Sequence, residues 1–273
     1  MLEIPEAIVL AEQLNRTIKG KHIKGVVAAL SPHKFAFYYE DPAEYDALLS
    51  DRVVGNTTAY GGRVEINLGD AVVHFGDGAN LRYYAAGEEI PAKHQLLVTF
   101  EDNSALVATV AMYGGLWAFP VGAMDDNFYY AAAKNAISPL SDEFSYEYFL
   151  RLFDEKKSKI SAKAFLATEQ RIPGLGNGVL QDVLFNAKIH PKRKMDELSD
   201  VQGLFSSVKS TLAEMVAFGG RDTERDLLGN YGGYKAKLSK NTLLSPCLDC
   251  GGQIKKETYL GGSIYFCEEC QEK

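Results

Sequence analysis

Four cysteines near the C-terminal end constrain the fold of this chain more than any other feature. They are the only cysteines in its 273 residues, and they form two pairs, Cys247-x2-Cys250 and Cys267-x2-Cys270, separated by 16 residues. Two such pairs bind one zinc ion tetrahedrally, and the segment between them has a suitable length for a β-hairpin. Because the chain supplies all four ligands, the zinc is expected to be structural. Four buried thiols or two disulfides are the alternatives.

Charge is distributed unevenly along this acidic chain. The net charge is −7; residues 1–130 contain 9 lysines and arginines against 17 acids, whereas residues 147–194 contain 10 against 5. A local basic surface can bind phosphate even on an acidic protein, because charges are screened beyond about 10 Å. An ordinary solvated helical surface is the alternative interpretation.

The first residues lack the composition of a secretion signal. Glu3 and Glu6 lie where a signal peptide carries basic residues. No stretch approaches the roughly 20 apolar residues of a membrane span. We therefore expect an intracellular, cytoplasmic protein without a membrane partner.

Hydrophobic periodicity divides the chain into a β-rich part and a helical part. Residues 4–20 have apolar side chains at helical spacing, with Pro5 in the first turn and Gly20 as the expected stop. Short β-rich runs follow up to about residue 125, among them a hairpin around Asp102 and Asn103. These patterns predict an antiparallel β-sandwich with one helix packed on it.

Helical patterns follow a linker that is marked by Pro139. Ser141 or Asp142 is the expected N-cap of a helix over 141–157, and a second helix is predicted over 161–170. Another helix begins after a glycine-rich turn at 173–177. A long helix is expected over 200–220, where two glycines end it.

The glycine-rich turn Pro173-Gly174-Leu175-Gly176-Asn177 is the second feature with chemical content. Its backbone can approach another molecule closely, and it opens into a helix whose free N–H groups and dipole attract an anion. Asn177 can cap that helix or donate to a phosphate. Basic residues flank the turn: Lys163, Lys188, His190, Lys192, Arg193 and Lys194. Glycines that serve only the packing of a helix hairpin are the alternative.

The segment PGLGNGVLQDVLFNAKIHP, followed by the four cysteines, resembles the formamidopyrimidine-DNA glycosylase and endonuclease VIII family. Other ordered anchors cover the whole chain: IPEAIVLAEQL, HFGDGANLRYY, YGGLWAFP and GGRDTERD. The resemblance implies an α+β fold with one structural zinc. Its parts are an N-terminal antiparallel β-sandwich with an N-terminal helix (1–130), a linker (131–140), a helix–two-turn–helix domain (141–234) and a β-hairpin zinc finger (235–273).

The resemblance also implies a reaction. Members of this family flip a damaged base out of the duplex and attack C1′ of its sugar with the N-terminal amine, usually that of a proline exposed by removal of Met1. The resemblance matches Glu3 to the acid/base residue and Glu6 to an acid that holds the N-terminus. It implies a monomer that binds double-stranded DNA, damaged or abasic, through Lys163, Gly176, Asn177 and Tyr234.

Several family positions that carry the chemistry hold other residue types in this chain. Leu2 stands where the family has proline, and its size disfavours removal of Met1, which leaves the amine one residue too far from the sugar. The other replaced positions contact DNA in the family: a lysine becomes Gly62 (beside Arg63), a void-filling methionine becomes Asp77, two arginines become Ala111 and Met112, and the finger arginine becomes Gly262.

We therefore predict a zinc-bound DNA-binding protein whose glycosylase and lyase chemistry is lost or strongly weakened, and which is associated with the nucleoid if its source is bacterial. One alternative is an active DNA glycosylase with abasic-site lyase activity that uses the N-terminal amine and Glu3 on oxidised bases. A regulatory module that binds proteins and has left DNA is the third hypothesis.

Overall fold

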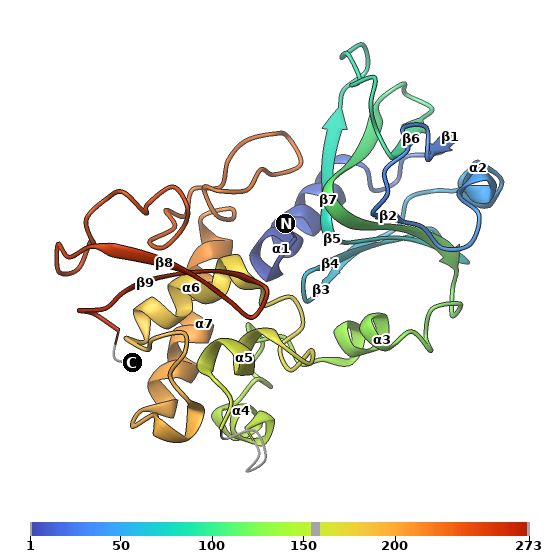
Figure 1. Ribbon diagram of the computed structural model, residues 1–273. Coiled ribbons are helices and arrows are strands. Elements are labelled where there is room, and N and C mark those ends of the chain that lie inside the picture. Colours follow the sequence, from blue (N-terminus) through green and yellow to red (C-terminus); the bar gives the residue numbers. More distant parts are fainter. Residues whose placement is uncertain (1, 154–158, 272–273) are drawn as a thin grey trace.

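The N-terminal helix connects the two halves of the molecule, a sheet half and a helical half (Figure 1). The computed structural model describes residues 2–153 and 159–271. Helix α1 (Ile4–Thr17) carries Pro5 in its first turn and ends three residues before Gly20, which has a positive φ of 84°. Ala7, Leu10 and Leu14 pack into the core of the sheet half, whereas Ile4 belongs to the helical core. The predicted helix is confirmed and is slightly shorter than expected.

A seven-stranded sheet forms the half of the molecule against which Ala7, Leu10 and Leu14 of α1 pack. The path runs β1-β6-β7-β5-β4-β3 with antiparallel neighbours, and the short β2 pairs in parallel with β7. The strands are β1 (Ile23–Ala28), β2 (Ala36–Phe37), β3 (Thr57–Tyr60), β4 (Arg63–Asn67), β5 (Ala71–Tyr84), β6 (Leu96–Phe100) and β7 (Ala105–Pro120).

Strands β5 and β7 are 14 and 16 residues long, and each takes part in both ends of the sheet. Apolar residues from each end, such as Val26 and Phe100 at one end and Ile66 at the other, share one core with α1. The β6–β7 turn contains Asn103 at a positive φ of 62°, where the hairpin was predicted. The predicted antiparallel β-rich fold with one helix packed on it is confirmed.

Short helices surround the sheet and lead out of it. The 3-10 helix η1 (Pro42–Glu44) continues into α2 (Tyr45–Leu49), and α3 (Phe128–Asn135) follows the last strand. Asn127 caps α3 by accepting the N–H of Tyr130. Among the described residues, no helix is both long and apolar enough to cross a membrane.

The helical half consists of α4 (Tyr146–Leu152), α5 (Ala162–Ala167), α6 (Asn177–Asn186), the 3-10 turn η3 (Met195–Glu197) and α7 (Val201–Ala217). Ser145 caps α4, so the prediction of Ser141 or Asp142 is wrong. Ser141 instead closes a turn with Ser138. Residues 154–157 of the predicted first helix lie outside the described part of the chain. The predicted stop of α7 is confirmed, because Gly219 and Gly220 have positive φ angles.

The C-terminal strands β8 (Ile254–Tyr259) and β9 (Gly262–Cys267) form the predicted hairpin. Its turn is made by Leu260 and Gly261, both at positive φ. The hairpin lies against α6, where the Gln181 amide donates to the Ser263 carbonyl (3.0 Å) and accepts the N–H of Tyr265 (3.1 Å).

The segment between α7 and the hairpin returns to the sheet half. Leu227 is buried in the sheet core, and its carbonyl accepts the N–H of Tyr83 (2.9 Å). The Arg82 guanidinium donates to the carbonyl of Asp226 (2.7 Å). The predicted domain boundaries at 130, 140 and 234 stay a prediction, since this segment contributes to both halves.

Asp182 on α6 anchors the chain just before the hairpin. Its carboxylate is 1% exposed and accepts the N–H groups of Lys237 (2.9 Å) and Leu238 (2.8 Å). Burial raises the pKa of Asp182 to about 6, against the opposing effect of these two donors. The folded chain therefore binds this proton more tightly than the unfolded chain does.

This shift predicts a pH dependence of stability. Because the pKa of Asp182 is higher in the folded state, its contribution to the free energy of unfolding is most favourable below about pH 4. This contribution decreases by up to about 3 kcal/mol as the pH rises through 6. Relative to the parent protein, the free energy of unfolding of Asp182→Asn in urea should therefore increase between pH 4.5 and 7.5. Parallel pH curves for the two proteins would contradict this assignment.

Candidate active site and metal centre

The backbone of the N-terminal segment is held between the two halves. The N–H of Leu2 donates to the Asp77 carbonyl in the sheet half (2.6 Å), and the N–H of Ile4 donates to the Gly174 carbonyl in the helical half (3.0 Å). Leu2 and Glu3 are 7% and 3% exposed. The segment therefore forms part of the seam between the halves and has a fixed position there.

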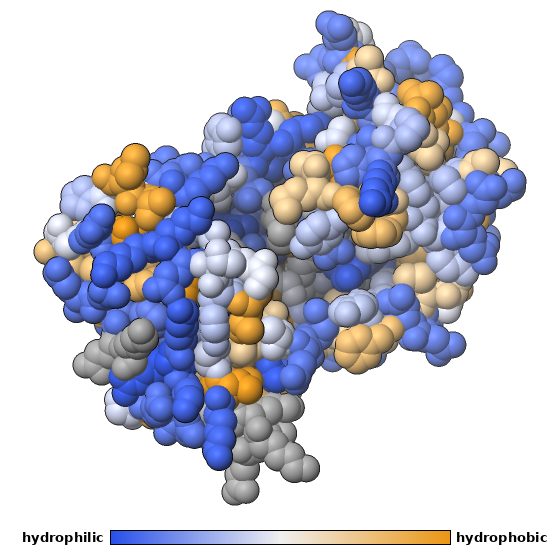
Figure 2. Space-filling view, in the orientation of Figure 1, coloured by the Kyte–Doolittle hydropathy of each residue, from blue (hydrophilic) through white to orange (hydrophobic). Residues whose placement is uncertain are grey.

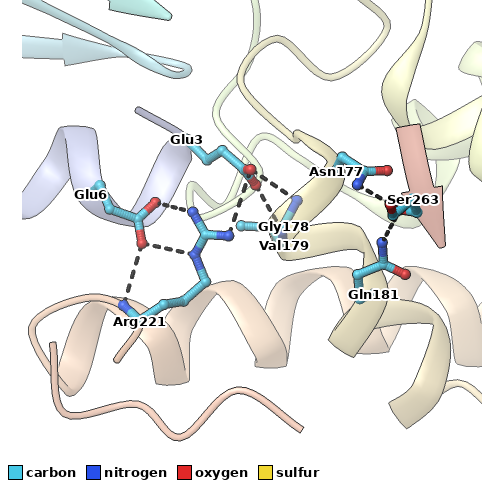
Figure 3. A network of polar contacts seen from close by, with 8 residues as sticks. All are labelled: Glu3, Glu6, Asn177, Gly178, Val179, Gln181, Arg221 and Ser263. Carbon is cyan, nitrogen blue, oxygen red and sulfur yellow. Dashed lines mark hydrogen bonds and ion pairs between the residues drawn. The ribbon is translucent and has the colours of Figure 1, made fainter. Parts of the chain in front are cut away.

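The Glu3 carboxylate occupies the N-terminus of α6 (Figure 3). It accepts the N–H groups of Gly178 (2.9 Å) and Val179 (2.7 Å). A Cβ atom at Gly176 would lie 2.7 Å from the Glu3 carboxyl carbon, so a glycine is required at that position. The helix terminus attracts an anion as predicted. The anion is the chain's own carboxylate, which corrects the expectation that these donors are free for a phosphate.

Arg221, just after the end of α7, connects Glu3 with Glu6. Its guanidinium donates twice to the Glu6 carboxylate (2.9 and 2.8 Å) and lies 3.5 Å from Glu3, and all three side chains are buried (Figure 3). Burial opposes its charge, but the two carboxylates outweigh this effect and raise the pKa of Arg221. Arg221 was missed in the sequence, where its only signal is a position directly after a helix-ending glycine pair.

Burial also changes the proton affinity of Glu3. The loss of water raises the pKa of its carboxyl, while Arg221 and the two backbone donors oppose this effect and Glu6 adds to it. A carboxyl with a raised pKa can take up or release a proton closer to neutral pH, which is the property that a general acid or base requires. The geometry of Glu3 is therefore compatible with the predicted acid/base role, which stays a prediction.

A cleft of about 510 Å³ lies beside Glu3, between the sheet, the helices and the hairpin tip. It corresponds to the hollow between the two halves in Figure 2. Its walls include Leu2, Asp77, Met112, Tyr113, Lys163, Asn177 and Gly262. A second cleft, of about 330 Å³, shares Leu2 and Asp77 with the first and adds Arg63 and Trp117. The structure thus brings many of the predicted site residues to one place.

Lys163 and Asn177 hold the hairpin tip against this cleft. The Lys163 ammonium donates to the Tyr259 carbonyl (2.7 Å), and the Asn177 amide donates to the Ser263 carbonyl (2.8 Å). A Cβ atom at Gly262 would lie 3.4 Å from both side chains. Lys163 is 4% exposed, and burial lowers its pKa. Their predicted contacts with DNA stay a prediction, and the structure adds a role in positioning the hairpin.

Tyr234 lies away from the cleft. Its side chain is 3% exposed and packs in the helical core, and its N–H donates to the Gly220 carbonyl (3.0 Å). The predicted contact of Tyr234 with DNA stays a prediction, and the structure adds a role for its ring in the helical core.

The β3–β4 turn leaves no room for a side chain at position 62. A Cβ atom at Gly62 would lie 2.9 Å from the Leu2 carbonyl oxygen and 3.0 Å from the Gly174 Cα. A lysine at this position would force the turn away from the N-terminal segment. The neighbouring Arg63 places its guanidinium over the Trp117 ring, 5.2 Å from the centroid, on the wall of the second cleft.

The four cysteines meet at one point, as their spacing predicts. All four sulfur atoms lie within 4.8 Å of one another, with 3.7 Å between Cys247 and Cys270 and 3.5 Å between Cys250 and Cys267. A tetrahedral zinc with bonds of about 2.3 Å requires sulfur separations of about 3.8 Å, whereas a disulfide requires about 2 Å. The donor set therefore fits one metal ion, and the alternative of two disulfides is wrong.

Removing Arg221 should be costly, because it would leave two buried carboxylates without their shared cation. We expect Arg221→Ala to lose about 3 to 5 kcal/mol of unfolding free energy at pH 7. Urea denaturation measures this loss, with Arg225→Ala as a control because Arg225 is an exposed cation on the same segment. Equal stability of the two variants would contradict the role assigned to Arg221.

Comparison with known proteins gives a consistent result along the whole chain. Residues 136–226 match the model of the formamidopyrimidine-DNA glycosylase H2TH domain. The formamidopyrimidine-DNA glycosylase of Cytobacillus firmus is 28% identical, with 99% of this chain and all of the relative covered. The enzyme of the same name from Wolbachia pipientis wMel is also 28% identical, with the same coverage.

Solved structures agree in fold. Lactococcus lactis Fpg in complex with DNA containing an abasic site superimposes with a TM-score of 0.83 at 22% identity, covering 99% of this chain and 100% of that one. The MutM (Fpg) protein from Thermus thermophilus superimposes with a TM-score of 0.81 at 23% identity, covering 98% of each chain. Together with the sequence anchors and the four-cysteine centre, these matches show that the chain belongs to the formamidopyrimidine-DNA glycosylase and endonuclease VIII family.

Proposed function

We propose that this protein binds damaged or abasic-site double-stranded DNA in the cleft beside Glu3, and that its glycosylase and lyase chemistry is lost or strongly weakened. Support for the ligand comes from the Lactococcus lactis relative, whose structure holds DNA with an abasic site. The cleft of this chain lies between the corresponding sheet and helical halves and contains Lys163 and Asn177 on one wall.

The backbone nitrogen of Leu2 is the single observation that carries the proposed loss of chemistry. With Met1 attached, this nitrogen is an amide, and its lone pair is delocalised into the peptide bond. Its one proton is donated to the Asp77 carbonyl at 2.6 Å. Nucleophilic attack on a sugar carbon requires a free lone pair within about 3 to 3.5 Å of that carbon, and this nitrogen offers none.

The composition of the cleft supports weaker binding of the DNA backbone. The family resemblance places a lysine at position 62, a methionine at position 77 and arginines at positions 112 and 262. In this chain these positions hold Gly62, Asp77, Met112 and Gly262, so cations are missing from both walls. Each lost phosphate contact lowers the salt dependence of DNA affinity by about one unit of logarithmic slope. We infer that binding depends less on salt than in relatives that keep these cations.

Borohydride trapping tests the chemistry. Incubation of the protein with abasic-site DNA and borohydride should give no covalent complex, because no amine reaches C1′. The variant Leu2→Pro, confirmed by mass to have lost Met1, places a secondary amine at the same position and should give a trapped complex. Glu3→Gln in that background should reduce the yield, and Glu12→Gln, an exposed acid on α1, should not.

A trapped complex with the parent protein would contradict the proposed loss of chemistry. That outcome would favour the second candidate, an active glycosylase and abasic-site lyase acting on oxidised bases. One observation supports this candidate: burial raises the pKa of Glu3, as an acid/base residue beside the sugar would require.

We also propose that the four cysteines hold one structural zinc ion that keeps the hairpin folded. Cys247 and Cys267 are buried, and a module this short has too little apolar core to fold alone. When bound, the zinc supplies cross-linking and no open coordination position. The hairpin then stays folded, and its carbonyl groups accept hydrogen bonds from Lys163, Asn177 and Gln181.

Removal of the metal should therefore unfold the C-terminal part selectively. Treatment with a strong zinc chelator is expected to abolish hydrogen-exchange protection in residues 246–271 and to leave the sheet strands at 63–84 protected. Added zinc should restore the protection. Unchanged exchange in residues 246–271 after complete metal removal, verified by elemental analysis, would contradict the proposed role.

A further inference from the structure

Two opposite charges, Arg63 and Asp77, line the second cleft, whose volume is about 330 Å³. The Arg63 guanidinium contacts His74 and the Trp117 ring, and no carboxylate in the described part of the chain forms an ion pair with it. Burial lowers the pKa of Arg63 and the charge of Asp77 opposes this effect, but the two groups do not pair with each other. A charge that is partly removed from water without a partner costs free energy. The cleft therefore favours a ligand that brings charges of its own.

The sheet provides the space that Arg63 needs at this place. Gly76 of β5 and Gly115 of β7 are direct partners across the two strands. A Cβ atom at Gly76 would lie 3.0 Å from an Arg63 guanidinium nitrogen and 3.2 Å from the Trp117 ring. A Cβ atom at Gly115 would overlap the same ring. This pair of glycines therefore makes room for the stacked guanidinium and indole on the cleft wall.

His74 fixes the orientation of Arg63. Its Nε2 lies 3.4 Å from an Arg63 nitrogen, and its Nδ1 lies 3.6 Å from the Glu65 carboxylate. Because a guanidinium can only donate, Nε2 is the acceptor and the ring proton is on Nδ1, toward Glu65. His74 and Glu65 are 1% and 7% exposed, and the Tyr130 hydroxyl of α3 donates to Glu65 (2.6 Å). The cation is thus held in one position before a ligand binds, which lowers the cost of binding.

The rest of the cleft surface is mainly apolar. It includes Leu2, Trp117, Met124, Tyr129 and Pro173. Small-molecule sites of this size are typically apolar, with a few polar groups that fix the orientation of the ligand. A matching ligand has an anionic group for Arg63, a cationic group for Asp77 and an apolar body. An α-amino acid with a large apolar side chain has these three features.

A DNA strand matches this cleft less well. It carries a phosphate at every nucleotide and no cationic group, and Asp77, which lines both clefts, repels phosphates. Asp77 also stands where the family resemblance places a methionine, so the family pattern does not account for this charge.

We propose that the second cleft binds a free α-amino acid with a large apolar side chain, its carboxylate on Arg63 and its ammonium group on Asp77. This inference goes beyond the proposed function and does not depend on it, because no DNA takes part. A backbone phosphate of DNA is the competing occupant of Arg63.

Tryptophan fluorescence tests this proposal, because Trp117 is the only tryptophan of the chain and lines the cleft. The probes are L-phenylalanine, its amide without the carboxylate, its N-acetyl derivative without the ammonium group, and glycine without the apolar side chain. L-phenylalanine should change the emission saturably. Each of the other three should bind about 10- to 100-fold more weakly, because one charged or apolar contact is lost.

Two variants assign the charges. Arg63→Gln should weaken the binding of L-phenylalanine by about 10- to 100-fold and leave the binding of its amide unchanged, because the amide has no carboxylate. Asp77→Asn should have the corresponding effect, with the N-acetyl derivative as the insensitive probe. Arg16→Gln is the matched control, since Arg16 is an exposed cation on α1 that lines neither cleft.

The four probes on the parent protein decide the proposal even if a variant fails to fold. No saturable change with L-phenylalanine, or equal affinity for all four probes, would overturn it. The same loss in Arg16→Gln as in Arg63→Gln would also overturn it. A third contrary result is a phosphate on Arg63: Arg63→Gln then weakens binding of an abasic-site duplex and lowers its salt dependence by about one unit of logarithmic slope, while L-phenylalanine has no effect on the parent protein.

Discussion

The contact between the Glu3 carboxylate and the first N–H groups of α6 is the interaction on which the arrangement of this molecule depends. It joins the third residue of the chain to the helical half, and Arg221 extends the same network to Glu6 and the end of α7. Taking a charge out of water costs several kcal/mol unless it is paired and hydrogen-bonded. Here each buried charge has a partner from a different segment, so α1, α6 and the segment after α7 must come together for any of them to be satisfied.

The close packing around this network also explains the glycines that the sequence places near it. Gly176 allows the Glu3 carboxyl to approach α6, and Gly62 allows the β3–β4 turn to touch the backbone of Leu2 and Gly174. The same packing has a functional consequence. A turn that touches the N-terminal segment has no room for a lysine at position 62, and the backbone nitrogen of Leu2 is held in place by its hydrogen bond to the Asp77 carbonyl. The proposed loss of glycosylase and lyase chemistry therefore rests on residues that also stabilise the seam.

The sequence predicted local features well, because local chemistry decides them. The cysteine spacing predicted the metal centre and its hairpin, and the glycine pair at 219 and 220 predicted the end of α7. Pairings over long distances were not predictable. Nothing near Arg221 indicates that its partners lie at residues 3 and 6, and nothing near Tyr234 indicates that its ring packs in the helical core. The cap of α4 was misplaced because Ser141 and Ser145 are equally suitable as caps, and only the turn with Ser138 decides between them.

The proposed loss of chemistry requires the nitrogen of Leu2 to be an amide in the working protein, and the covalent state of the N-terminus decides this. Mass spectrometry of the N-terminal peptide, from protein isolated from its natural source, measures that state without any assumption about substrate. We expect a residue to remain attached to the nitrogen of Leu2. A peptide that begins at Leu2 with a free amine would contradict it, because the nucleophile of the family would then be present in the cleft.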